Sequence, residues 1–266
     1  MVHRLFLILT LCFGPAPARA AEIMFEGYYR VENGGKHIGY AIQRYEFEPK
    51  DKSFHGISFL RAKFGDKTVQ ESLKAKTNDK FQPQSYQYTS QIGEDVKMID
   101  ASFQGEIMKL KINDGKKVRD ETHKIPKGTF FSSFLTYLML QKPLALNQAF
   151  QYSAIAEEEG ASYNGKALLE SKETKNGLEV YRILNSFKGD KFVSQVAIVK
   201  DPKDATKNIR GEVLGTSSPV KSIATRLVTA PSEATENQTV PNKVLVTLFG
   251  GMPTGKTHLL EKKPGP

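Results

Sequence analysis

The sequence of 266 residues is poor in the side chains that bind metals or act as thiol nucleophiles. Its one cysteine, Cys12, lies within the first 20 residues. If that segment is removed during export, disulfides, cysteine nucleophiles and thiolate metal sites are all excluded. The histidines outside the first 20 residues are His37, His55, His123 and His258, and they show no i,i+4 pair or comparable ligand spacing. The sequence therefore predicts no metal centre.

Apolar runs long enough to span a bilayer are also missing, since the run from Leu5 to Phe13 is far shorter than the ~20 residues required. This run follows the basic Arg4 and precedes Ala18-Arg19-Ala20, a small-x-small cleavage pattern. We therefore expect residues 1–20 to be a signal peptide and the mature chain to begin at Ala21. The protein should then be exported, and a periplasmic location is favoured.

A lipoprotein is an alternative interpretation of the same N-terminal segment. Acylation of Cys12 would make a lipoprotein, but Leu11 stands where a small residue is expected.

The charge of the mature chain is moderately basic. Removal of Arg4 and Arg19, with no acid, lowers the formal charge from +9 to +7. The lysines are scattered singly, which favours a solvated surface over a nucleic-acid interface, while attraction to an anionic membrane surface stays open.

Alternating apolar and polar residues dominate the chain from residue 21 to 230, with Gly, Asn or Asp between the runs. Asn33-Gly34-Gly35 predicts the first hairpin turn, and "KLKINDGKK" repeats the pattern. Because the connections are short, neighbouring strands should pair antiparallel. The predicted fold is mainly β: one domain with a curved antiparallel sheet, a half-barrel-like meander, wrapped around one amphipathic helix.

That helix is predicted over Thr129–Gln141, with Thr129 as its N-cap and Pro143 beyond its end. Its apolar residues recur at helical spacing, and it should cover the open face of the sheet. The same face could instead be the wall of an apolar ligand cavity. The candidate ligand-lining residues are Phe130, Phe131, Phe134, Leu135 and Leu138.

The C-terminal region carries the one formal nucleotide-binding motif, G-x-x-x-x-G-K-T, from Gly250 to Thr257. A phosphate loop requires a following helix, and only nine residues follow Thr257. We therefore expect no nucleotide to bind at Gly250–Thr257. Residues 231–242 are predicted to be a linker or long loop. Residues 243–266 are predicted to be a terminal hairpin and tail, with strands at Lys243–Phe249 and Thr257–Glu261.

Catalytic patterns are equally sparse, because the chain has no G-x-S-x-G motif and the serines of "FFSSF" lie in the predicted helix. Glu71 is the one carboxylate predicted to point inward, between Val69 and Leu73. Such a carboxylate more often contacts solvent than takes part in catalysis. Tyr29, Tyr86 and Tyr88 are interpreted as cross-strand aromatics. We predict no catalytic residues, no cofactor and no enzyme activity.

Three stretches resemble a family of uncharacterised secreted bacterial proteins that share a domain of unknown function. They are "FEGYYRVENGGKHIGY", "IPKGTFFSSFLTYLMLQKPLALNQAFQY" and "GKALLESKETKNGLEVYRI". The resemblance spans roughly Glu26 to Lys200. It implies a curved sheet around a helix, similar to the half-barrels of periplasmic lipoprotein carriers, which bind acyl chains in an apolar concavity.

Three functions follow as hypotheses. The first is a non-enzymatic envelope protein that binds an apolar or lipidic ligand, or another envelope protein. The second is a structural scaffold with a filled core, and the third is an outer-membrane barrel, because alternating strands also occur there. The sequence does not distinguish a filled core from a cavity.

Overall fold

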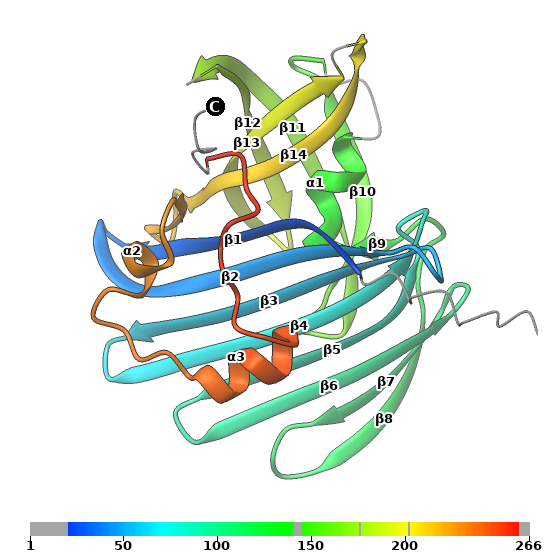
Figure 1. Ribbon diagram of the computed structural model, residues 1–266. Helices are drawn as coiled ribbons and strands as arrows, with labels where there is room; N and C mark the ends of the chain where they lie inside the picture. The colour runs from blue at the N-terminus through cyan, green and yellow to red at the C-terminus, as the bar shows by residue number, and fades with distance from the viewer. Residues whose placement is uncertain (1–20, 141–144, 176, 202, 261–266) are drawn as a thin grey trace, which may run out of the picture.

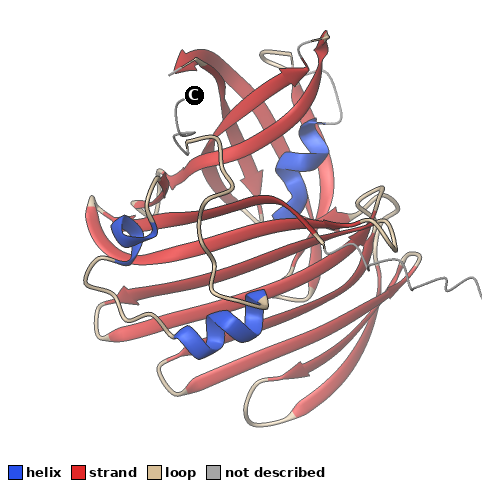
Figure 2. Ribbon diagram, viewed as in Figure 1, coloured by secondary structure: helices blue, strands red, loops and turns tan. Residues whose placement is uncertain are grey.

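One sheet of 15 strands forms nearly the whole molecule (Figure 1). The computed structural model describes residues 21–140, 145–175, 177–201 and 203–260. The predicted signal peptide and the end of the predicted tail, residues 261–266, lie outside these ranges. Three short helices accompany the sheet (Figure 2).

The strands and helices have the following bounds. The first eight strands are β1 (Glu22–Asn33), β2 (Lys36–Glu48), β3 (Ser53–Phe64), β4 (Lys67–Asn78), β5 (Pro83–Ile92), β6 (Asp95–Gln104), β7 (Ile107–Asn113) and β8 (Val118–Lys124). The short β9 (Phe130–Phe131), a 3-10 turn η1 (Ser132–Phe134) and α1 (Leu135–Leu140) follow. The remaining elements are β10 (Ala149–Ala156), β11 (Ala161–Lys175), β12 (Leu178–Phe187), β13 (Asp190–Asp201), β14 (Asp204–Ser218), β15 (Ile223–Val228), α2 (Pro231–Thr235) and α3 (Asn242–Phe249).

The strand order is β8-β7-β6-β5-β4-β3-β2-β1-β15-β14-β13-β12-β11-β10-β9. Two meanders are therefore joined where β1 pairs with β15, for example Tyr29 opposite Leu227. Every pairing is antiparallel except that of β9 with β10. The prediction of a mainly β, half-barrel-like sheet around a helix is confirmed, and the sheet stays open, with β8 and β9 as its edges.

The inner face of the curved sheet is filled by aromatic and aliphatic side chains around η1 and α1. Phe131 and Phe134 are buried in this cluster, and the Phe134 ring meets the Tyr45 ring edge-on at 5.4 Å. Gly56 makes room for Phe134, because a Cβ there would lie 3.0 Å from its ring. Tyr86 and Tyr88 pack in the same cluster across β4–β6, as predicted.

The predicted helix begins later than expected. Phe130 and Phe131 form a strand that pairs with β10, and the Thr129 hydroxyl donates to Pro126 O rather than capping a helix. Successive strand side chains point to opposite sides. Phe130 therefore enters the cluster beneath β10–β13, whereas Phe131 enters the inner cluster with Phe134. Gln141, the predicted helix end, lies outside the described residues.

A second core on the outer face of β1–β3 was not predicted. Side chains from these strands and from β15 are buried there under α2 and α3 (Figure 1). Leu245 and Phe249 of α3 are buried at i,i+4 spacing. The cluster consists of Tyr28, Tyr40, Ile42, Ile57, Phe59, Val228, Ala234, Leu245 and Phe249.

The predicted C-terminal hairpin is therefore wrong: its first strand, Lys243–Phe249, is the helix α3. The β-branched residues of "KVLVTLF" suggested a strand, but burial of one helical face on β1–β3 overrides that propensity. Residues 231–242, predicted to be a linker or long loop, contain α2, and its Ala234 is completely buried. Thr257 does make a strand-like bridge, but with Glu26 of β1.

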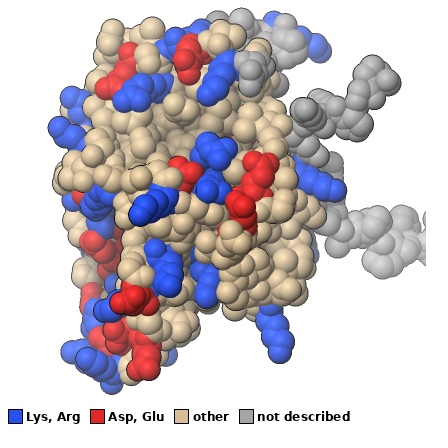
Figure 3. All heavy atoms as spheres, turned by 90° about the vertical axis from the view of Figure 1, so that its left-hand side faces the viewer, with Lys and Arg blue, Asp and Glu red and all other residues tan. Residues whose placement is uncertain are grey.

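Across the described residues, no helix is both long and apolar enough to traverse a bilayer. On the face shown in Figure 3, Lys and Arg side chains alternate with Asp and Glu. Exposed ion pairs on the molecule include those of Lys76 with Asp51 and Lys221 with Asp190.

Replacement of Phe134 by Ala tests the inner core. Phe134 is 1% exposed, so its deletion should lower the free energy of unfolding by about 3 to 5 kcal/mol. Denaturant unfolding followed by circular dichroism measures this change. Val220→Ala, at a position that is 81% exposed, is the control and should be nearly neutral. A loss below about 1 kcal/mol for Phe134→Ala would mean that its ring does not pack as described.

Candidate functional site

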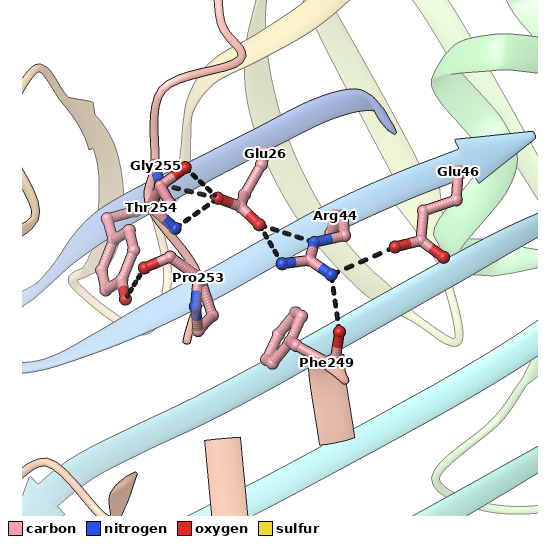
Figure 4. Close-up of polar contacts among 8 residues, drawn as sticks. Glu26, Arg44, Glu46, Phe249, Pro253, Thr254 and Gly255 are labelled. Atoms are coloured by element: carbon pink, nitrogen blue, oxygen red, sulfur yellow. Dashed lines mark hydrogen bonds and ion pairs between the residues drawn. The ribbon is translucent and has the colours of Figure 1, made fainter. Parts of the chain in front are cut away.

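The Gly250–Thr257 motif forms a loop around a carboxylate of the protein itself (Figure 4). Glu26 Oε1 accepts hydrogen bonds from Thr254 N at 2.6 Å, Gly255 N at 2.7 Å and Thr254 Oγ1 at 3.0 Å. Consecutive backbone N–H groups that converge in this way form an anion-binding nest. The Glu26 carboxylate occupies that nest and is only 1% exposed.

Arg44 of β2 binds the other oxygen of Glu26 and the end of α3. Its Nε donates to Glu26 Oε2 at 2.6 Å, and its Nη1 donates to Phe249 O at 2.7 Å and to Glu46 Oε1 at 3.1 Å. Phe249 is the last residue of α3, where carbonyl groups lack intrahelical partners and favour a cation. One buried arginine therefore ties the first strand pair to the C-terminal helix.

The glycine spacing that resembles a phosphate loop has a packing explanation. Gly250 has φ 72° and ends α3, as left-handed glycines commonly do. Gly255 has φ 64°, and a Cβ there would lie 2.8 Å from the Tyr28 ring. Tyr28 also donates its hydroxyl to Pro253 O at 3.1 Å. Lys256, the motif lysine, is exposed.

The chain continues from this loop across β1 toward β14 (Figure 1). Glu26 N donates to Thr257 O at 2.9 Å, and Leu259 N donates to Glu212 Oε2 at 2.6 Å. Glu212 is buried on β14. We call residues 250–260 the C-terminal strap, because they fasten both meanders through two buried carboxylates.

The second candidate site is a cavity of about 550 Å³ on the inner side of β2–β5. This volume lies within the range of small-molecule pockets. Its apolar lining residues are Tyr29, Ala41, Ile42, Phe59, Leu60, Leu73, Tyr88 and Val213. Its polar lining residues are Gln43, Ser58, Glu71, Ser72, Ser132, Ser133, Glu157, Glu158, Thr216 and Thr225. The cavity therefore combines apolar surface with hydrogen-bond acceptors.

Glu157, directly after β10, is 3% exposed and binds the turn η1. Its carboxyl accepts from the hydroxyls of Ser132 and Ser133, each at 2.7 Å, and from Ser133 N at 3.3 Å. Burial raises the pKa of the Glu157 carboxyl, and these hydrogen bonds partly offset the rise. The contacts explain why the serines of "FFSSF" face inward.

Glu71 points inward, as predicted, and lines the cavity from β4. Burial raises the pKa of its carboxyl, the hydroxyl of Tyr88 offsets part of this rise, and the negative charge of Glu158 adds to it. The other prediction for this region concerned the aromatic residues of the helix. Phe130, Phe131 and Phe134 are packed in core clusters, and Leu135 and Leu138 are partly buried beside them. The turn η1 reaches the cavity through Ser132 and Ser133.

One serine–histidine contact among the described residues lacks the geometry of a nucleophile–base pair. The Ser53 hydroxyl lies 2.9 Å from His55 Nε2 and donates to Asp51 Oδ1 at 2.6 Å. A serine that already donates to a carboxylate cannot donate the same proton to histidine, so this is not a nucleophile–base pair. Within the described ranges, no cluster of three His, Cys, Asp or Glu side chains could hold a metal ion.

No family model and no curated protein matches the sequence. Among solved structures, the chain is similar to a β-barrel-like protein of a domain of unknown function, DUF1849, from Brucella abortus. The identity is 9% and the TM-score 0.49, over 76% of this chain and 94% of that chain.

The buried Glu26–Arg44 ion pair allows a test of how the C-terminal strap is held. Glu26→Ala removes the ligand of the nest and leaves Arg44 buried without its carboxylate, so unfolding should become easier by about 3 to 5 kcal/mol. The strap should also become sensitive to limited proteolysis, read as cleavage after residue 249 by mass spectrometry. Lys256→Ala is the matched control within the loop and should leave both measurements unchanged. Equal effects of the two substitutions would contradict this account of the nest.

Glu157 predicts a pH dependence of stability. Because its pKa is raised in the folded protein, the folded state binds this proton more tightly than the unfolded state does. The contribution of Glu157 is fully present below the unfolded carboxyl pKa of about 4.3 and is lost as pH rises through the higher folded value. Glu157→Gln should remove this decline, measured as the difference in unfolding free energy from wild type between pH 4 and 8. Exposed Glu94→Gln should leave a flat difference, and a flat difference for Glu157→Gln would refute the prediction.

Proposed function

We propose that this protein is an exported, non-enzymatic protein of the cell envelope that binds a small apolar or lipidic ligand in its inner cavity. The observation that carries the proposal is the cavity beside η1, whose lining combines apolar side chains with hydrogen-bond acceptors. Binding pockets commonly combine a mostly apolar lining with a few placed polar groups. Export and a periplasmic location are supported by the signal-peptide pattern of residues 1–20.

Two observations support the negative parts of the proposal, one on the strap and one on the surface charges. The backbone donors that a nucleotide would need at Gly250–Thr257 are already bound to Glu26. On the face shown in Figure 3, basic side chains are interspersed with acidic ones, which does not favour nucleic acid. We therefore propose that neither nucleotide nor nucleic acid is a partner.

A scaffolding role is the second candidate, and one observation favours it. The aromatic residues predicted to line a cavity, including Phe131 and Phe134, fill the core instead. A protein with this interior could serve an envelope partner through its surface alone. Both candidates agree on export, so the test must examine the cavity.

The test fills the cavity and measures ligand. Ser58→Phe places a ring in the cavity, and Ser102→Phe places the same ring at an exposed position of β6 as a control. We expect organic extraction of the natively purified protein to yield an apolar molecule by mass spectrometry. The neutral fluorescent probe N-phenyl-1-naphthylamine should bind the wild type and Ser102→Phe, and at least tenfold more weakly to Ser58→Phe.

Circular dichroism and thermal unfolding establish that both variants are folded before binding is compared. A clean extract together with no probe binding would reject the cavity as a ligand site and favour scaffolding. Probe binding that Ser58→Phe leaves unchanged would reject the cavity as the site of that binding.

A further inference from the structure

Glu71 is a cavity-lining carboxylate without a cation. It lies on the inner face of β4 between Val69 and Leu73, and it makes no ion pair with any side chain in the described ranges. Its electrostatic neighbours are the hydroxyl of Tyr88 and the carboxyl of Glu158. A half-buried carboxylate is costly in such surroundings unless a donor or cation reaches it.

Two lysines bind at Glu158, a neighbour of Glu71 in the cavity lining. Lys188 pairs with Glu158 and Glu159, and Lys97 donates to Glu158 O at 2.7 Å. Among the described residues that line the cavity, none is Lys, Arg or His, whereas three are Glu. A bound molecule would therefore meet hydrogen-bond acceptors and the negative charge of Glu71 in the polar part of the lining.

The Glu157 carboxyl, also in the polar lining, already has hydrogen-bond partners within the protein. Glu157 is occupied by Ser132 and Ser133, so its acceptor capacity is largely used. Glu71 keeps free capacity, because a carboxylate accepts about four hydrogen bonds and Tyr88 supplies one. Leu60 and Leu73, also in the lining, offer apolar surface close to Glu71, since Leu60 is its cross-strand partner.

We propose that the inner cavity selects amphiphiles whose polar end is a protonated amine, held by the Glu71 carboxylate, over amphiphiles that end in a carboxylate or phosphate. The inference rests on the proposed function, since it names the chemical class that the same cavity would take. An ammonium supplies both the missing cation and several donors, and an apolar tail covers the leucine and tyrosine wall. An anionic head would face the Glu71 carboxylate and would be repelled.

The overall charge of the protein makes this preference distinctive. The chain carries a formal net charge of +9, which falls to +7 without residues 1–20. Attraction to the protein as a whole would therefore favour anionic amphiphiles. A preference for the amine can arise only from the local acidic lining.

The experiment compares three ligands with the same tail, decylamine, 1-decanol and decanoate, as competitors of N-phenyl-1-naphthylamine at pH 7 and below their aggregation concentrations. Decylamine should displace the probe at a concentration about tenfold lower than decanoate, the difference expected for one charge-assisted hydrogen bond in a partly buried site. Decanol should fall between them. In Glu71→Gln, the amine and the carboxylate should compete within about twofold of each other.

Glu94→Gln removes an exposed carboxylate and is the control, so it should keep the full preference. If the wild type binds decanoate as well as decylamine, or if Glu71→Gln keeps the preference, the charge selection is wrong while ligand binding stands. If neither the probe nor any of the three competitors binds, the proposed function fails and this inference fails with it. The wild-type ranking is informative even if a variant does not fold.

Discussion

The burial of the Glu26 carboxylate is the constraint that organises the outer side of this molecule. A carboxylate that is 1% exposed requires several donors, and it obtains them from Arg44, Thr254 and Gly255. Two of these donors lie more than 200 positions along the chain from Glu26. The C-terminal strap must therefore return to β1, and α3 must lie where Arg44 can reach Phe249 O. Apolar packing favours contact between α3 and the sheet, and the hydrogen bond from Arg44 to Phe249 O also fixes where the helix ends.

The same constraint accounts for the glycine spacing of the G-x-x-x-x-G-K-T motif. Phosphate loops and this strap share a physical device, since glycine-permitted turns expose consecutive N–H groups to an anion. In this protein the anion belongs to β1, and the lysine of the motif stays in solvent. Motif spacing describes the geometry of the cradle, while the rest of the fold decides what occupies it.

The meander was predictable from sequence because strand periodicity is a local property. Turn residues at Asn33-Gly34-Gly35 and the alternation in β7 place the strands and their faces without long-range information. The inward position of Glu71 followed from the same alternation. The helical identity of α3 did not, because "KVLVTLF" carries both β-branched residues and helical spacing, and burial against β1–β3 decides between them. A usable signal was present in β1–β3, whose strands are apolar on both faces and therefore need a cover on each side.

The candidate cavity was less predictable than the fold, and the reason is the backbone at "FFSSF". As a continuous helix, this stretch would direct its aromatic residues to one face. As a strand followed by a 3-10 turn, it sends Phe130 and Phe131 to different clusters and turns Ser132 and Ser133 toward Glu157. Glu157 follows the apolar end of β10, and nothing in the local pattern shows which groups it meets across 24 residues of chain. The buried Glu157 carboxylate stabilises this irregular backbone through hydrogen bonds that a regular helix would not need. The space beside that irregular segment, together with the unpaired carboxylate of Glu71, gives the inner face a polar side that a core filled only by phenylalanine would lack.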